Sequence, residues 1–261
     1  MVKVSDIISA LDSFAPFSLQ ESYDNCGLQV GDPSMLSSGV LLAVDLTEEV
    51  LDESIDCGLN TIVVHHPPIF RGVKSLVSTD PLARMLVRAI KHDVAIIAAH
   101  TNVDKAYGGV SYIMGQKLGL THMRPLACQG DDGFGLGVVG SLAGSLPVAD
   151  FLGNVRRLLG CRCLRHTVPV CSEVHTVALC GGSGASLTGD AIKAGADVYV
   201  SADFKYHDFF DAAGVVTLVD AGHFETERYV VEIFYDVLTK KFTNFAVRQT
   251  SAYTNPVIYL Y

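Results

Sequence analysis

The 261-residue sequence contains neither a long apolar run nor a cluster of basic residues. No apolar stretch reaches the ~18 residues that a membrane-spanning helix requires, so a membrane protein is not expected. The opening residues have no long apolar segment after Lys3, which argues against a secretory signal peptide. The formal net charge is -9, and without clustered lysines and arginines the chain is not expected to bind nucleic acid.

Charged residues are also scarce, at 18%, whereas apolar residues make up 49% of the chain. This balance is typical of an ordered globular protein. The length allows one large hydrophobic core or two modest ones.

The seven cysteines do not form a recognisable disulfide framework, because their number is odd and their spacing is irregular. This usage indicates free thiols in a reducing compartment, and we expect a cytoplasmic protein. Cys161 and Cys163 stand too close together for the usual zinc-knuckle spacing. We interpret the cysteines as small buried hydrophobic residues.

An α/β pattern occurs twice along the chain. Residues 40–44 are expected to form a strand and 48–57 a helix capped by Gly58, and a second strand over 61–64 ends at His65 and His66. The second copy consists of a strand over 177–180, a helix over 187–194 capped by Gly195, and a strand over 198–200. When the two copies are superposed without gaps, His65 and His66 fall on Ala202 and Asp203.

A second pair of segments matches more closely in sequence. The strand over 94–99 is followed by His100 and, four residues on, Asp104, and the strand over 217–221 is followed by His223 and Glu227. Each is followed by a helical stretch, over 110–118 and 229–238 respectively. An imidazole and a carboxylate four residues apart at the start of a helix can face the same pocket.

The alternation of strands and helices predicts an α/β fold with mostly parallel sheets. We expect two similar α/β lobes, residues 1–125 and 126–261, that face a shared metal-binding cleft. The best linker candidate is the segment 129–133. The second lobe is expected to begin with a strand over 134–142 and a helix over 148–159.

Three predicted strand ends supply a set of imidazoles and carboxylates without thiolates. Its members are His65, His66, His100, Asp104, His223 and Glu227. Such donors suit Zn, Mn, Fe, Co or Ni, and two carboxylates allow one of them to bridge two ions. The simpler alternative is that these residues are separate polar caps on different strands, but the equivalent positions in both repeats favour a shared site.

Five motifs, in order along the chain, resemble the family of GTP cyclohydrolase I type 2 homologues, also called the NGG-interacting-factor-3-like family. They cover residues 21–28, 65–70, 100–104, 195–199 and 222–227. The resemblance implies a dinuclear site in which His65 and Asp104 bind one ion, His66 and His223 bind the other, and Glu227 bridges them. It places His100 beside the site, orienting ligands or substrate, and implies a homohexamer. Thr226 stands where a serine is usual.

Three other features have both a functional and a structural interpretation. Asp24 and Asn25 are either turn residues or contacts to the metal site. His207 follows the strand end at Asp203 and is either a general acid or an exposed loop histidine. The glycine-rich segment 181–184 either cradles a phosphate or forms a tight turn between a strand and a helix.

Two functions are compatible with this pattern. The first is a metal-dependent hydrolase of a nucleotide or related heterocycle, with His100 or His207 moving protons. The second is a non-catalytic protein that handles metal or regulates a partner. A catalytic site must keep an open coordination position, whereas a storage site does not need one.

Overall fold

The structure is a computed structural model that describes residues 1–128 and 133–260. Within these residues the chain forms two compact units: unit 1 contains residues 1–103 and 230–258, and unit 2 contains 104–229 and 259–260. The boundary expected at 125/126 instead falls within a strand that is paired along its length with the next one. Of the expected linker, residues 129–132 lie outside the described residues.

Unit 1 is built on a sheet whose strand order, in the described chain, is β1-β4-β3-β2-β11. All its pairings are parallel except that of β1 with β4. The central strands are four-residue apolar runs that are fully buried. The strands are β1 (Gly27–Val30), β2 (Val40–Ala43), β3 (Thr61–Val64), β4 (Ala95–Ala98) and β11 (Val247–Gln249).

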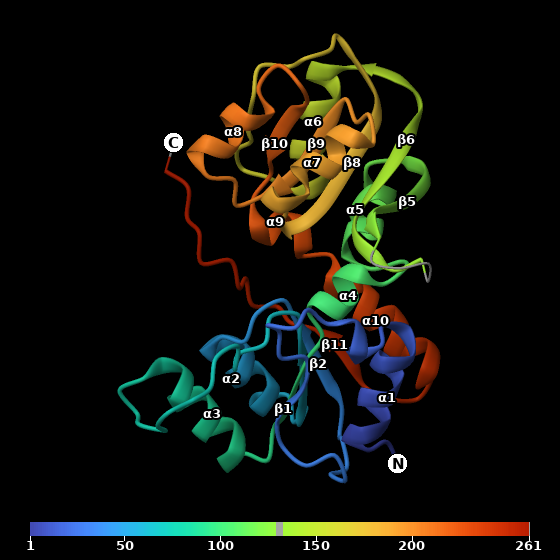
Figure 1. The fold of residues 1–261 in the computed structure, drawn as a ribbon. Helices are drawn as coiled ribbons and strands as arrows, with labels where there is room; N and C mark the ends of the chain where they lie inside the picture. The colour runs from blue at the N-terminus through green and yellow to red at the C-terminus, as the bar shows by residue number, and fades with distance from the viewer. Residues whose placement is uncertain (129–132, 261) are drawn as a thin grey trace. The chain divides into compact units, whose positions relative to one another are not determined.

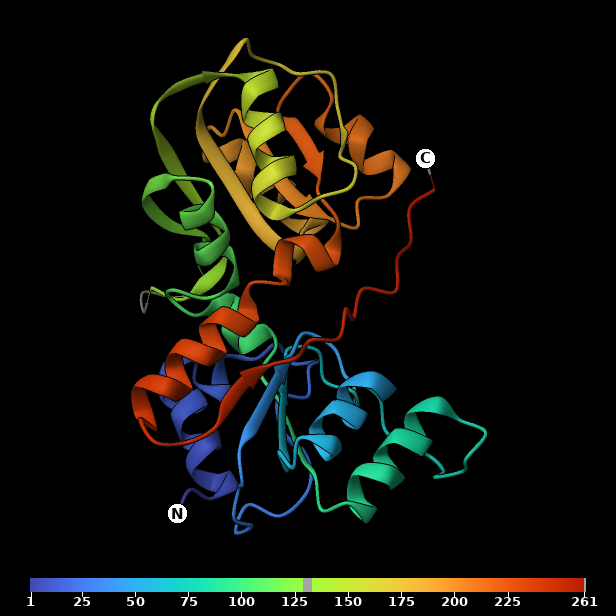
Figure 2. The same cartoon turned by 180° about the vertical axis from the view of Figure 1, so that it is seen from behind.

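Helices cover both faces of this sheet (Figures 1 and 2). Helices α2 (Glu48–Asp56) and α3 (Pro81–Lys91) pack on one face, where their apolar residues meet side chains of β2, β3 and β4. Helices α1 (Val4–Phe14) and α10 (Val230–Lys241) pack on the other face and against each other. Unit 1 also contains the short helix η1 (Phe17–Leu19) and the first residues of α4 (Thr101–Lys105), which continues into unit 2.

Unit 2 has a mixed sheet, with the strand order β5-β6-β8-β9-β10-β7 in the described residues. Only β8-β9 and β9-β10 are parallel there, because β5 and β6 join the sheet as antiparallel strands and β7 pairs antiparallel with β10. The strands are β5 (Leu120–Cys128), β6 (Gly135–Pro147), β7 (Arg165–His166), β8 (Glu173–Ser183), β9 (Val198–Ala202) and β10 (Thr217–Asp220).

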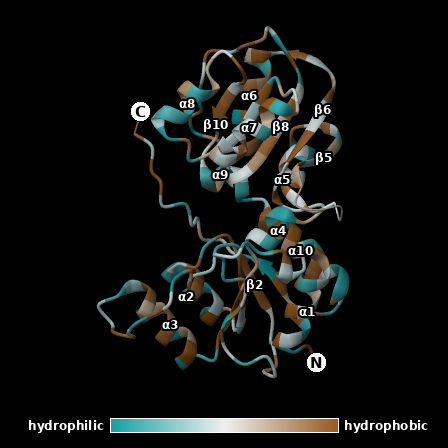
Figure 3. Ribbon diagram, in the orientation of Figure 1, coloured by the Kyte–Doolittle hydropathy of each residue, from teal (hydrophilic) through white to brown (hydrophobic). Residues whose placement is uncertain are grey.

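Alternating residues of these strands bury two separate cores. Val177 and Leu179 face α5 (Val110–Lys117) and α6 (Val148–Leu159), whereas Ala178 and Cys180 face the opposite side. That side is covered by η2 (Ala185–Leu187), α7 (Thr188–Lys193) and α8 (Tyr206–Ala212). The short helix α9 (His223–Glu227) follows β10 and contacts β8 and α5. Figure 3 shows the hydrophobic strands inside both units.

The α/β class is confirmed, since both units combine a sheet with helices. Mostly parallel pairing is correct for unit 1 and wrong for the mixed sheet of unit 2. The segment 134–142 does form a strand, β6, but β5 precedes it in the same sheet. No helix in the described parts of the chain has the length and apolarity needed to span a bilayer.

Candidate metal centre

The ends of β3 and β4 bring three histidines together in unit 1. Because the two strands are parallel and adjacent, their carboxyl ends meet at one edge of the sheet. The backbone N–H groups of His65 and His66 both donate to the carbonyl of Val44, at 3.0 and 3.1 Å, which fixes the turn after β3. His100 follows β4 directly and precedes α4.

The three imidazoles form a compact triangle. Ring centroids lie 5.0 Å apart for His65 and His66, 5.2 Å for His65 and His100, and 5.4 Å for His66 and His100. One ring nitrogen of each lies within 4.8 Å of the others, close enough to share a metal ion. His65 is fully buried, and the other two are half-buried. His100 is thus as much a part of this group as the two predicted ligands.

In each of these rings Nδ1 is held by an acceptor. His65 Nδ1 donates to the carbonyl of Ala99 at 2.9 Å, which requires the proton on Nδ1 and leaves the lone pair on Nε2. His66 Nδ1 is held by Asp45 Oδ1 at 2.6 Å, and His100 Nδ1 by Asp24 Oδ1 at 2.9 Å. Metal-binding histidines characteristically have such partners, which fix the tautomer and the ring orientation.

Asp24 is the hydrogen-bond partner of His100. It also forms a local hydrogen bond within its own turn, as the sequence predicted for a turn residue. Its carboxylate accepts from the backbone N–H of Asn25 at 2.8 Å and from the N–H and hydroxyl of Thr101. Burial opposes ionisation, but the hydrogen bonds from His100 and Thr101 hold the pKa of the Asp24 carboxyl well below its usual range. A buried carboxylate therefore stands behind His100.

Unit 2 carries the second His-x-x-x-acid motif at the end of β10. His223 opens α9 and Glu227 ends it, one turn later on the same face, so that His223 Nε2 lies 3.0 Å from Glu227 Oε2. The Nδ1 atom of His223 is held by Asp203 Oδ2 at 2.6 Å. Asp203, the repeat counterpart of His66, has φ of +58°, and this left-handed conformation ends β9.

These two carboxylates control the charge of His223. Burial disfavours the imidazolium, but hydrogen bonds to Asp203 and Glu227 outweigh it and raise the pKa of His223 to about 11. The pKa of Asp203 is lowered in turn by its hydrogen bond with His223. An environment that stabilises a positive ring is also suited to a metal cation.

Residues 181–183 of the glycine-rich segment form the end of β8, where Gly182 lies against Glu227. A Cβ on Gly182 would lie 2.0 Å from Glu227 Oε1, so only glycine leaves room for the carboxylate. The backbone N–H groups of Gly181 and Gly182 donate to Ser111 Oγ at 3.2 Å and Thr226 Oγ1 at 3.0 Å. Because these donors are committed within the protein, the phosphate-cradle hypothesis for these two amides is wrong.

The remaining predicted site residues are Asp104 and His207. Asp104 lies in α4, four residues after His100, and is half-buried. His207 lies in α8, is exposed, and contacts the rings of Tyr206 and Phe210, at centroid distances of 5.4 and 6.2 Å.

Among the described residues, no cysteine belongs to a group of side chains that could hold a metal ion. All seven lie within the described residues and are free thiols. Cys161 and Cys180 are buried as expected, whereas Cys57, Cys128 and Cys163 are exposed, which corrects the interpretation of the whole set as buried. Burial raises the pKa of Cys180 to about 12, and the charges of Asp104 and Glu227 add to this effect. Cys180 is therefore a neutral thiol.

The donors thus fit a borderline divalent metal. Imidazole nitrogens and carboxylate oxygens without thiolate suit Zn, Fe, Mn, Co or Ni. The fixed tautomer of His65 and the carboxylate partners of His66 and His223 are features of this structure that support that use.

Comparisons with known proteins agree with this fold. Residues 2–256 match the family model described as Duf34/NIF3 (NGG1p interacting factor 3). A Clostridium perfringens protein named "GTP cyclohydrolase 1 type 2 homolog" is 33% identical over 232 residues, which are 87% of each chain. A Streptomyces coelicolor protein of the same name is 35% identical over 87% of this chain and 82% of its own.

Solved structures show the same fold. The crystal structure of a hypothetical protein from Staphylococcus aureus superposes with a TM-score of 0.92 at 30% sequence identity, covering 99% of both chains. A Bacillus cereus protein related to NIF3 superposes with a TM-score of 0.90 at 25% identity, again over 99% of both chains. The sequence resemblance is therefore confirmed, and the chain belongs to the Duf34/NIF3 family.

Proposed function

We propose that the chain binds a pair of divalent metal ions through three histidines and two carboxylates contributed by both units. The proposed ligands are His65, His66, Asp104, His223 and Glu227. The observation that carries the proposal is that the Nδ1 atoms of all three histidines are held by acceptors, which orients each Nε2 for a ligand. His65 and His66 belong to unit 1, whereas Asp104, His223 and Glu227 belong to unit 2.

In this proposal His65 and Asp104 hold one ion, His66 and His223 hold the other, and Glu227 bridges them. Bound ions would supply Lewis acidity, polarising the substrate and lowering the pKa of a water molecule to about neutrality. Binding at His223 would use Nε2 in its deprotonated form, while the ring proton at Nδ1 is held by Asp203.

We further propose that the site hydrolyses a nucleotide or a related heterocycle. The name that the curated relatives carry, GTP cyclohydrolase 1 type 2 homolog, supports this substrate class. His100 would hold or pass a proton at Nε2, since its Nδ1 is bound to Asp24. His207 is a second proposed proton donor, because it is exposed and lies four residues after Asp203.

The second candidate function is metal handling or regulation without turnover. The family description, an interacting factor, favours it, and the same ligands would serve it. We also propose a homohexamer in the cytoplasm. The hexamer rests on the family resemblance, and the seven free thiols support the reducing compartment.

The test is to measure the metal content of protein purified without added metal, before and after reconstitution with each candidate ion. We expect two ions per chain in the wild type, loss of metal in His66→Ala, and unchanged content in His92→Ala, an exposed histidine at the end of α3. Wild type that holds no metal under any condition would contradict the proposal.

Turnover on a panel of nucleotides and phosphoesters then separates the two functions. Hydrolysis that disappears in His66→Ala but persists in His92→Ala supports the enzyme. Two ions per chain with no turnover on any substrate supports the handling role. His100→Gln and His207→Gln with full metal content should lower turnover if these residues move protons.

A further inference from the structure

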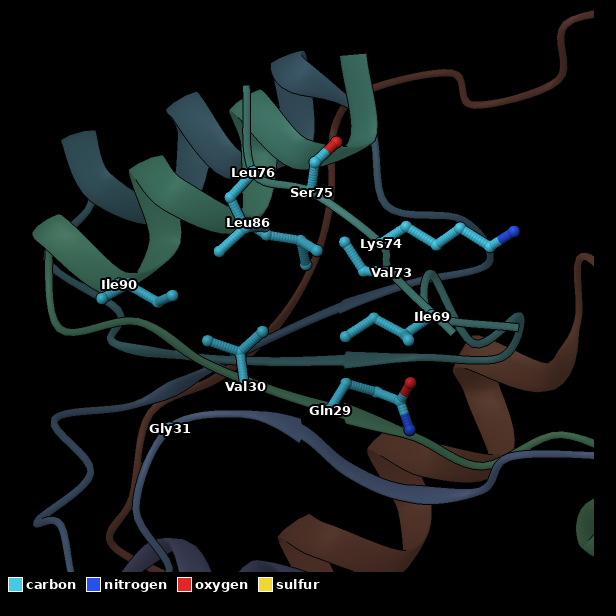
Figure 4. A pocket seen from close by; sticks show the side chains of 10 residues that line it. All are labelled: Gln29, Val30, Gly31, Ile69, Val73, Lys74, Ser75, Leu76, Leu86 and Ile90. Carbon is cyan, nitrogen blue, oxygen red and sulfur yellow. The ribbon is translucent and has the colours of Figure 1, made fainter. Parts of the chain in front are cut away.

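Unit 1 contains a pocket of about 390 Å³. It lies between β1, α3 and the segment 69–76 (Figure 4). This volume falls in the range of ~300–1,000 Å³ typical of small-molecule sites. None of the proposed metal ligands lines it among the described residues, so it is a separate site.

The walls of the pocket are branched aliphatic side chains. They are Val30, Ile69, Val73, Leu76, Leu86 and Ile90. In the described lining there is no aromatic ring on which a planar base could stack. The pocket therefore suits a flexible alkyl chain, in contrast to the heterocycle proposed for the metal centre.

The pocket has a closed floor and an open mouth. Leu86 is 2% exposed and packs into the core, whereas Leu76 and Ile90 are 53% and 56% exposed. Large aliphatic side chains that gather in one exposed hollow usually mark a binding site. An alkyl chain entering this hollow would cover them.

The polar groups of the pocket differ in availability. The Gln29 amide is committed, since its Nε2 donates to Asn25 O at 2.7 Å and its Oε1 accepts from Asn25 Nδ2 at 3.3 Å. Asn25 also donates to the carbonyl of Ile69 at 2.7 Å, which holds the wall formed by the loop in place. The exposed Lys74 ammonium and Ser75 hydroxyl remain at the rim (Figure 4).

Lys74 is the one charged side chain among the described residues that line the pocket. A cation at the mouth of an aliphatic pocket is complementary to an anionic head group. We propose that this pocket binds a medium-chain aliphatic carboxylate, with the alkyl chain against Leu86 and the carboxylate beside Lys74 and Ser75.

The test is a calorimetric titration of the metal-loaded protein with hexanoate, octanoate and decanoate. We expect one molecule bound per chain and an affinity that rises about fourfold for each added methylene until the pocket is full. Decanol should bind more weakly than decanoate, because it lacks the charge that Lys74 meets. An affinity that does not depend on chain length, or no saturable binding of any of these probes, would overturn the proposal.

Two variants locate the binding. Ile90→Glu places a charge in the hollow and should weaken decanoate binding by at least about tenfold, whereas Val168→Glu changes an 85% exposed residue outside the pocket and should not. Lys74→Glu should weaken decanoate more than decanol. Equal decanoate affinity in Ile90→Glu and the wild type contradicts the proposal. So does an Ile90→Glu variant in which only the oligomeric state changes, since the face would then be a contact between copies of the chain. Unchanged circular dichroism and metal content show that each variant is folded.

Discussion

Asp45 holds the His66 ring from the side opposite the proposed metal. Its Oδ1 lies 2.6 Å from His66 Nδ1, and its Oδ2 accepts from Thr254 Oγ1 at 3.2 Å, which fixes the carboxylate. Replacing Asp45 by Asn keeps an acceptor but removes the charge that makes the imidazole a stronger ligand. We expect Asp45→Asn to lower the affinity for divalent metal by about tenfold or more, measured by competition with a fluorescent chelator.

The matched control for this variant is Asp93→Asn. Asp93 is exposed and has φ of +53°, a conformation that asparagine tolerates well. Its metal affinity should equal that of the wild type. Equal affinity in Asp45→Asn itself would mean that His66 is not a ligand under these conditions.

Substitution of Gly182 tests whether metal binding depends on the position of the Glu227 carboxylate. Gly182→Ala has two costs: the positive φ of +62°, and a Cβ 2.0 Å from Glu227 Oε1. Gly195→Ala has the first cost alone, because its φ is +70° and nothing lies within 4 Å of an added Cβ. We expect Gly195→Ala to lose about 1 kcal/mol of unfolding free energy with full metal content.

Gly182→Ala should lose more stability than Gly195→Ala and also lose metal. Urea unfolding and metal analysis measure both quantities on the same samples. If the two variants behaved alike, the contact between Gly182 and Glu227 would have no part in metal binding.

The partners of the histidines show what sequence reasoning at this scale misses. His65, His66, His100 and His223 could be selected because each follows an apolar strand, which is a local signal. Asp24 lies 76 residues before His100, and Asp45 lies 21 residues before His66, so only the folded sheet brings them together. Asp203 was already aligned with His66 by the repeat, but its contact with His223 depends on β9 lying beside β10.

At the scale of elements, α2 holds the C-terminal segment through a single carboxylate. Glu53 accepts from Thr250 Oγ1 at 2.5 Å and from the backbone N–H of Ser251 at 3.0 and 3.1 Å, just after β11. Burial raises the pKa of Glu53, but these hydrogen bonds outweigh it, and the net pKa is lowered. We expect Glu53→Gln to lose about 1 kcal/mol at pH 7, since Glu53 is only half-buried.

The pH dependence of this difference has a definite sign. Because the pKa of Glu53 is lower in the folded protein, its stabilisation is present above the ordinary value of 4.5 and is lost as the pH falls through the folded value. The gap between the wild type and Glu53→Gln in urea unfolding should therefore shrink below pH 4.5. Asp56→Asn, on the exposed end of the same helix, should stay within about 0.5 kcal/mol of the wild type. A gap that persists unchanged to low pH contradicts this assignment.

Elements with strong local signals could be predicted from sequence. The strand over 61–64 and the helix over 148–159 are found with the expected bounds, and Gly58 and Gly195 end their helices with positive φ. Strand β5 contains Pro125 and alternates irregularly, so its membership of a sheet depends on pairing with β6. Strand β11 is three residues long and is stabilised by its pairing with β2, 207 residues away in sequence, rather than by its own propensity.

At the scale of the whole molecule, unit 1 is discontinuous in sequence. Its second segment, residues 230–258, follows the main segment of unit 2 along the chain. Helix α10 packs against α1 and β2, and β11 extends the sheet through its register of Val247 with Val40. The internal repeat in the sequence does not predict that the C-terminal segment belongs to unit 1, because comparison of the two copies assumes that each lobe is a continuous stretch of the chain. This is why the expected division at 125/126 differs from units that change at 103/104 and 229/230.

The two divisions predict different folding of fragments. The fragment 104–229 contains β5 to β10, α5 to α9 and both cores of unit 2, so we expect it to unfold cooperatively in urea with the circular dichroism of an α/β protein. The fragment 1–125 lacks α10 and β11 and should not show a cooperative transition, because the part of its sheet that α10 covers and the edge of β2 would be exposed. The fragment 126–261 is the control for the other division, since it lacks α5 and most of β5. Cooperative unfolding of 1–125 and 126–261, with none for 104–229, would contradict the units described here and favour a boundary at 125/126.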